Sequence, residues 1–130
     1  MHRILIVDDS STIRKMVRAS LHGVAGTEFV EAASGLEAIE QLALGSVALI
    51  VLDLNMPDMH GIEVLKFVRA HRTHRGVPII VLTTRGDEAS RTTASHAGAT
   101  TYLTKPFAPQ VLASTARSLL DLDSTPVHLD

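Results

Sequence analysis

The chain of 130 residues contains no cysteine and no tryptophan, and only one tyrosine and three phenylalanines. Without cysteine, disulfides, thiol catalysis and cysteine-ligated zinc are all excluded. Aromatic residues make up 3% of the chain, which argues against a platform on which bases or a flavin could stack. The formal net charge of -2 gives no sign of attraction to nucleic acid or to anionic membranes. We therefore expect neither a nucleic-acid partner nor membrane insertion.

Long apolar runs are also missing. Runs such as Val47–Leu52 are far shorter than the roughly 20 residues that cross a bilayer. Acidic residues arrive by position 8, so the N-terminus has no signal-peptide core. These features favour a cytoplasmic protein. The length predicts one domain, because a domain usually spans roughly 100–200 residues. We assign residues 1–122 to this domain and residues 123–130, which show no periodicity, to a flexible tail.

Five short apolar runs alternate with helical patterns along the chain. Their length and β-branched content fit strands. The first, third and fourth runs are almost wholly apolar, as expected for parallel strands covered on both faces, whereas the second and fifth are mixed and belong nearer the edges. Five βα units in series predict an α/β fold with a doubly wound five-stranded parallel sheet. The expected strands are Arg3–Val7, Glu28–Ala32, Val47–Leu52, Pro78–Leu82 and Thr100–Leu103.

Five helices are expected, each with an apolar face. Ser34 and Glu37 form a capping-box pattern at the start of the second helix, and Pro109 suits the first turn of the fifth. The fourth helix, roughly Asp87–Ala97, offers only alanines to the core and should be weakly held. The residues expected to face the core are Ile13, Met16, Val17 and Leu21 in the first helix, Leu36, Ile39, Leu42 and Ala43 in the second, Val64, Leu65 and Val68 in the third, Ala89, Ala94 and Ala97 in the fourth, and Leu112, Ala116 and Leu119 in the fifth.

Polar side chains follow four of the five expected strands. Asp8 and Asp9 follow the first strand, Asp53 the third, Thr83 the fourth and Lys105 the fifth. Taken singly, each has a simple structural explanation, such as a helix cap or a turn hydroxyl. Doubly wound sheets, however, bind their ligands at the carboxyl ends of the strands. The shared edge therefore favours a single site built from all five side chains.

The residue types at this edge indicate phosphoryl transfer assisted by a hard cation. Three neighbouring carboxylates and water are typical ligands of Mg²⁺, and a carboxylate beside such an ion can form an acyl phosphate. The metal, the Lys105 ammonium and the Thr83 hydroxyl can each stabilise one phosphoryl oxygen. Asp53 ends the central strand and is the expected nucleophile. Asp58, in the loop that follows, is expected to be solvated.

Four segments of the sequence closely resemble the receiver domain of bacterial two-component response regulators, the CheY-like fold. The segments are ILIVDDSSTIRKM, LIVLDLNMPDMHGIEVLKFVR, PIIVLTTRGD and YLTKPF, and the resemblance spans roughly Arg3–Leu120. It implies the strand order 2-1-3-4-5. It also implies a stand-alone response regulator in phosphorelay signal transduction, with chemotaxis among the pathways that such a protein can serve.

The resemblance also implies roles for individual residues. Asp53 is the phosphoacceptor, and Asp8 and Asp9 serve a site for Mg²⁺ (or Mn²⁺), with Asp9 as a direct ligand. Asp53 is a ligand of the same metal, and Asn55 adds its backbone carbonyl.

The remaining residues would contact the phosphate or respond to it. Thr83 and Lys105 would contact the phosphoryl group, and Tyr102 would be the switch aromatic that packs inward when the Thr83 hydroxyl moves. The Lys105–Pro106 bond would be cis. The donor would be a sensor histidine kinase or a histidine phosphotransfer domain. Phosphate would switch a face formed by the fourth helix, fifth strand and fifth helix for a downstream effector. The protein would catalyse its own phosphorylation and dephosphorylation without turning over a separate substrate.

Several other functions stay open. The protein could be a phosphorelay intermediate or a phosphate sink instead of an output messenger. A phosphatase of the haloacid-dehalogenase type needs a second acid two residues after the nucleophile, where this chain has Asn55. A flavodoxin-like flavin carrier shares the fold class, but the first loop here carries acids and aromatics are few. His71 and His74 suggest a metal pair; without further ligands nearby, a solvated basic end of the third helix is the better interpretation.

Overall fold

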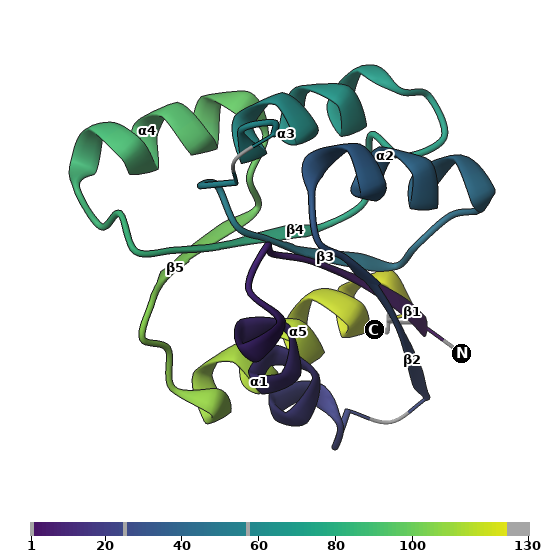
Figure 1. Cartoon of the computed structure of the whole chain (residues 1–130). Coiled ribbons are helices and arrows are strands. Elements are labelled where there is room, and N and C mark those ends of the chain that lie inside the picture. The colour runs from purple at the N-terminus through teal and green to yellow at the C-terminus, as the bar shows by residue number, and fades with distance from the viewer. Residues whose placement is uncertain (1, 25, 57, 125–130) are drawn as a thin grey trace, which may run out of the picture.

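The computed structural model describes residues 2–24, 26–56 and 58–124, with side chains as far as residue 120. Five parallel strands form one sheet in the order β2-β1-β3-β4-β5, which confirms the predicted fold class and strand order. Helices α2, α3 and α4 cover one face of the sheet, and α1 and α5 cover the other (Figure 1). The elements are β1 (His2–Val7), α1 (Ser11–Leu21), β2 (Thr27–Ala32), α2 (Gly35–Leu44), β3 (Leu49–Leu52), α3 (Gly61–Ala70), β4 (Ile79–Thr83), α4 (Glu88–Ala97), β5 (Thr101–Thr104) and α5 (Pro109–Ser124).

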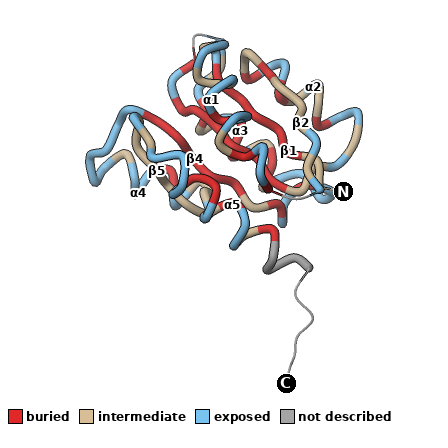
Figure 2. The backbone as a smooth tube through the Cα atoms, turned by 90° about the horizontal axis from the view of Figure 1, so that it is seen from below, coloured by how far each residue is buried: buried red, intermediate tan, exposed pale blue. Residues whose placement is uncertain are grey.

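The sheet separates two apolar layers. Side chains alternate across a strand, so in β1 Leu5 and Val7 pack under α2, α3 and α4, whereas Ile4 and Ile6 pack against α1 and α5. Strands β3 and β4 are buried throughout, as their unbroken apolar runs predict. Figure 2 shows β4 in the red of buried residues. The core therefore lies along the three central strands, and their ends are held rigidly.

Parallel register brings the carboxyl ends of the strands to one level. Val7 pairs with Leu52, Leu52 with Val81, and Thr83 with Thr104. The residues that follow β1, β3 and β5 therefore leave the sheet at the same edge. The predicted strand bounds were close, except that β3 begins at Leu49 and not at Val47. Val47 and Ala48, the two residues before Leu49, are only partly buried.

The predicted core faces of the helices were right in α3 and α5 and partly wrong in α1, α2 and α4. In α1 Val17 and Leu21 are buried and Ile13 is half-buried, whereas Met16 is exposed. Successive helical residues are 100° apart, so a small rotation of a helix is enough to move an apolar residue to solvent. The other expected core residues that prove exposed are Leu36 and Ala43 in α2 and Ala89 in α4.

Helix α4 has little apolar surface in the core. All of its residues are described, and only Ala94 is buried. Alanine removes little area from water, so few contacts oppose a displacement of this helix. The expectation that the fourth helix offers little apolar surface to the core is confirmed, and its weak attachment stays a prediction.

Local signals set several helix ends as predicted. The Ser34 hydroxyl accepts a hydrogen bond from the Glu37 N–H at 3.1 Å, and a Glu37 carboxylate oxygen accepts one from the Ala33 N–H at 2.8 Å. This is the expected capping box, with the return bond shifted by one residue. Pro109 opens α5, which continues to Ser124. The rest of the expected tail, residues 125–130, lies outside the described residues.

The segment after α3 differs from its prediction. His74 is only 4% exposed, so the expected solvated basic end was wrong at this position. In a tight turn, the His74 N–H donates to the His71 carbonyl at 3.0 Å, and the two rings are in contact with centroids 4.8 Å apart and planes tilted by 33°. The Lys105–Pro106 bond is cis, as the family resemblance implied. Among the helices that the structure describes, none combines the length and the apolar character that crossing a bilayer requires.

Candidate functional site

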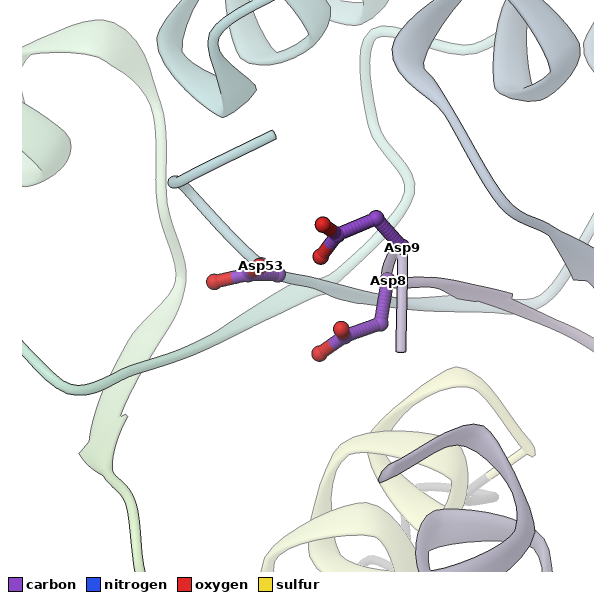
Figure 3. A group of neighbouring side chains, drawn as sticks. All are labelled: Asp8, Asp9 and Asp53. Carbon is purple, nitrogen blue, oxygen red and sulfur yellow. The ribbon is translucent and has the colours of Figure 1, made fainter. Parts of the chain in front are cut away.

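Three carboxylates meet at the carboxyl edge of the sheet. Asp8, Asp9 and Asp53 each place an oxygen within 4.8 Å of the other two (Figure 3). Asp8 and Asp53 are 3% and 4% exposed, whereas Asp9 is exposed. The prediction that these acids converge is confirmed.

Backbone hydrogen bonds place the two strand ends side by side. The Asp53 N–H donates to the Val7 carbonyl at 2.9 Å, and the Asp8 N–H donates to the Ala32 carbonyl at 3.1 Å. Both acids are thus extensions of the parallel ladder, so their side chains inherit the rigidity of the sheet. Asp9 lies one residue further on, in the turn before α1.

Lys105 provides a cation beside two of these acids. Its Nζ lies 2.8 Å from Oδ2 of Asp8 and 3.6 Å from Oδ1 of Asp53. The Lys105 N–H donates to the Thr83 carbonyl at 2.8 Å, which anchors the start of the loop at the end of β4. One ammonium therefore contacts two of the three carboxylates, and the group of acids has more negative than positive charge.

The Asp53 carboxyl has a raised pKa. Burial is the main cause, and the negative charge of Asp8 adds to it. The Lys105 ammonium and the Asn55 N–H, which donates to Oδ1 of Asp53 at 3.3 Å, act in the opposite direction but do not cancel the effect. The ionised form of Asp53 is therefore less favourable in the folded protein than it is for an aspartate in water.

A divalent cation fits the residues present. The donors are all carboxylate oxygens, which hard cations such as Mg²⁺ prefer, and Asp9 leaves one side of the group open to solvent. Burial and the charge of Asp8 both raise the pKa of Asp53, and a cation beside the group would act against both. Asp8, Asp9 and Asp53 are the side chains that could hold such an ion.

Thr83 is joined to the acidic group through Asn55. Its hydroxyl is fully buried at the end of β4 and accepts hydrogen bonds from the Asn55 side-chain amide at 3.3 Å and from the Arg85 N–H at 3.4 Å. Asn55 therefore contacts Asp53 through its backbone and Thr83 through its side chain. Four of the expected strand ends thus contribute to a single site.

Tyr102 lies away from this site. Its hydroxyl donates to the carbonyl of Arg85, and the Arg91 guanidinium lies over its ring, 4.7 Å from the centroid. Burial raises the pKa of the Tyr102 hydroxyl. The loop after Thr83 links Tyr102 to the site, because Arg85 takes part in both contacts.

Asp58 is exposed, as expected, but it is not simply solvated. Its two carboxylate oxygens accept hydrogen bonds from the Gly35 N–H at 3.2 Å and the Leu36 N–H at 3.1 Å. Loss of water would raise the pKa of Asp58, but the donors Leu36 and Gly35 lower it on balance. The carboxylate thus ties the loop after β3 to the first turn of α2.

Sequence reasoning missed Arg14 and Glu31. Nη1 of Arg14 donates to the Asp8 carbonyl at 2.7 Å, and its Nε donates to Oε1 of Glu31 at 2.9 Å. The available signal was the helical period, because Arg14, Val17 and Leu21 recur at spacings of three and four. A cation in a buried stripe, opposite an acid in the mixed second strand, indicates a specific contact.

Comparison with known proteins agrees with this geometry. The family described as "Response regulator receiver domain" matches residues 4–117. A "Chemotaxis protein CheY homolog" of Campylobacter jejuni is 39% identical, and the match covers 94% of this chain and 95% of that protein. "Chemotaxis protein CheY1" of Helicobacter pylori is 41% identical, and the match covers 85% of this chain and 90% of that protein. The crystallised chemotaxis response regulator CheY4 of Vibrio cholerae superposes with a TM-score of 0.84 at 38% identity, covering 92% of this chain and 98% of that one.

Proposed function

The chain belongs to the family of response regulator receiver domains, and on this premise we propose that it accepts a phosphoryl group on Asp53 in a cation-dependent reaction. As a CheY-type receiver it is a component of two-component signalling. The observation that carries the proposal is the convergence of Asp8, Asp9 and Asp53, with Lys105 at 2.8 Å from the first of them. We place the protein in the cytoplasm, where the kinase domains of such systems act.

The acidic group would hold Mg²⁺, or Mn²⁺ in its place. Asp8, Asp9 and Asp53 would contribute carboxylate oxygens, with Asp9 as a direct ligand, and Asn55 would contribute its backbone carbonyl. A bound divalent ion supplies positive charge that offsets the acids and the phosphoryl oxygens. Burial of Asp8 and Asp53 then becomes favourable, because their charges are no longer uncompensated.

Asp53 would act as the nucleophile toward a phosphohistidine. One of its carboxylate oxygens forms the new O–P bond while the P–N bond to the donor imidazole breaks, and the imidazole leaves with the electron pair. The Lys105 ammonium, now between Asp8 and Asp53, would move to a phosphoryl oxygen. The Thr83 hydroxyl, which accepts a hydrogen bond from the Asn55 amide, would move to donate one to a second phosphoryl oxygen.

The output would be a change in the face formed by α4, β5 and α5. Movement of the Thr83 hydroxyl toward the phosphate would pull on Arg85, whose carbonyl holds the Tyr102 hydroxyl. Helix α4 buries only Ala94, so few contacts would oppose its displacement. A sensor histidine kinase or a histidine phosphotransfer domain would supply the phosphate, and a downstream effector would bind the altered face. A phosphorelay intermediate or phosphate sink would use the same chemistry without an effector.

Intact-protein mass spectrometry tests the chemistry. Incubation with acetyl phosphate and Mg²⁺ should add one phosphoryl group to the wild type and none to Asp53→Asn, and EDTA should abolish the adduct. Asp58→Asn is the matched control, because Asp58 lies in the same loop but outside the acidic group. It should still be phosphorylated. An adduct on Asp53→Asn, or none on the wild type, would contradict the proposal.

The output face has its own test. Phosphorylation should shift the NMR amide signals of α4 and β5 more than those of α2. Tyr102→Ala should reduce these shifts while the mass adduct persists. If Tyr102→Ala abolishes phosphorylation itself, the assignment of Tyr102 to the output is wrong.

A further inference from the structure

The turn that carries Asp8 and Asp9 is clamped by a residue that the proposed chemistry does not use. Arg14 is the fourth residue of α1, and its guanidinium reaches back to the Asp8 carbonyl oxygen at 2.7 Å. The same guanidinium donates to Glu31 at 2.9 Å. Arg14 therefore joins its own helix, the turn after β1 and the edge strand β2.

The contact is well placed to control Asp9. The carbonyl of Asp8 and the N–H of Asp9 belong to one planar peptide group, so fixing the carbonyl also fixes the direction in which the Asp9 chain leaves the turn. The Asp9 carboxylate makes no hydrogen bond or ion pair with any other residue that the structure describes. Its approach to Asp53, visible in Figure 3, depends on the backbone.

Asp8 is held differently. Its Oδ1 accepts a hydrogen bond from the Ser10 N–H at 2.9 Å, and its Oδ2 contacts Lys105 at 2.8 Å. Its own backbone N–H is part of the sheet ladder. Loss of the Arg14 contact would leave Asp8 largely in place and would release Asp9, the more exposed of the two acids.

Glu31 holds Arg14 in turn. Glu31 pairs with Ile6 in the register of β1 and β2, close to the strand end. Its second oxygen binds Arg18 at 2.7 Å. The Arg14 side chain is 16% exposed and the Arg18 side chain 48%, so only Arg14 is enclosed between the strand and the turn.

We propose that Arg14 is a positioning residue for the cation site, which it serves by orienting the Asp8–Asp9 peptide so that the Asp9 carboxylate faces Asp53. The inference rests on the proposed function, since it concerns the cation that Asp53 chemistry needs. Groups that orient metal ligands from outside the ligand set typically change metal affinity 10- to 100-fold when they are removed.

The sign of the effect separates positioning from simple electrostatics. Arg14 is a positive charge near a cation site, so its charge alone weakens cation binding, and removing that charge would tighten it. Positioning predicts the opposite result. Arg14→Gln should weaken Mg²⁺ binding by about tenfold. Arg14→Lys keeps the charge but cannot make both bonds of the planar fork, so it should also weaken binding, by a smaller factor.

The measurement is a Mg²⁺ titration followed by the NMR amide signals of Asp9, Ser10 and Asn55, without any phosphodonor. Arg18→Gln is the matched control, because it removes a contact to Glu31 without touching Asp8. It should bind Mg²⁺ within about twofold of the wild type. Thermal unfolding in EDTA reports whether each variant is folded, and Arg14→Lys provides the comparison if Arg14→Gln is not.

Three outcomes decide the matter. Weaker binding in both Arg14 variants and unchanged binding in Arg18→Gln supports the inference. Equal or tighter binding in a folded Arg14 variant overturns it while leaving the proposed function intact. No Mg²⁺ binding by the wild type overturns the cation site of the proposed function, and the inference with it.

Discussion

The Lys105 ammonium lies 2.8 Å from a carboxylate oxygen of Asp8, although 97 positions separate the two residues in the chain. The contact spans the sheet, from the loop after β5 to the end of β1. Both side chains are largely buried. Lys105 is therefore a structural counter-ion of the acidic group as well as the proposed contact for phosphate.

Lys105→Met should destabilise the protein when no divalent ion is present. The substitution leaves Asp8 buried without its cation, and removing one partner of a buried ion pair costs about 3–5 kcal/mol. Urea unfolding in EDTA measures this loss. Because the variant has more uncompensated negative charge, added Mg²⁺ should stabilise it more than it stabilises the wild type. Equal stability of the two proteins in EDTA would contradict this assignment.

Asp53→Asn should increase the free energy of unfolding in EDTA at pH 7. The raised pKa of Asp53 means that the folded state disfavours the ionised form, so at a pH above both the folded and the unfolded pKa the carboxylate lowers stability. The penalty should shrink as the pH falls through the raised folded pKa, because the group then becomes neutral in the folded protein. The increase in unfolding free energy caused by Asp53→Asn should accordingly be larger at pH 7 than at pH 4. Urea unfolding at the two pH values measures it. A less stable variant at pH 7 would argue against the burial and charge repulsion assigned to Asp53.

Gly61→Ala should destabilise the protein by about 1–3 kcal/mol, the usual range for an overpacked position. A Cβ at Gly61 would lie 2.5 Å from the Asp53 carbonyl oxygen and 2.6 Å from the Leu54 Cα, so backbone would have to move. The displaced backbone carries Asp53, and the rate of phosphorylation by acetyl phosphate should fall as well.

Gly76→Ala is the control for this substitution. A Cβ at Gly76 meets nothing within 4 Å, and the unfolding free energy should change by less than about 0.5 kcal/mol. If both alanine variants unfold at the same urea concentration, the close approach at Gly61 has no energetic consequence.

Asp58→Asn should alter how stability depends on pH. The lowered pKa of Asp58 in the folded state means that its carboxylate stabilises the protein fully above the ordinary pKa of 3.8, and that this contribution is lost as the pH falls through the lower folded value. The difference between wild type and variant should therefore be largest near neutral pH and shrink in acid. Urea unfolding between pH 7 and pH 3 measures it. A difference that grows in acid would reverse the assigned sign.

Local patterns were enough to predict the strands and the residues that follow them. The runs that became β1, β3 and β4 are apolar over nearly their whole length, and such runs have few alternatives to a buried parallel strand. Once the strands are parallel, their ends must share an edge. The meeting of Asp8, Asp9, Asp53 and Lys105 follows from that single geometric fact.

Helix orientation was harder to predict. Met16, Leu36 and Ala89 are apolar and fall near the expected stripes, yet they face solvent. The rotation of a helix on a sheet is decided by the sum of its contacts, and Arg14 takes a half-buried place in α1 because Asp8 and Glu31 are there to receive it. The helical period places Arg14 in the half-buried stripe, but no local pattern identifies Asp8 and Glu31 as its partners.

The sequence by itself determined the order of the elements, the edge at which the site forms and the chemical types that meet there. These depend on residues close together in the chain, on strand ends and on helix caps such as Ser34. Only the tertiary structure decided the partners of Arg14, Asp58 and His74. Each of these side chains is polar and can be hydrated in water, so its own chemistry does not require a protein partner. Its position is set by the group that the packed fold brings within hydrogen-bonding or ring-contact distance.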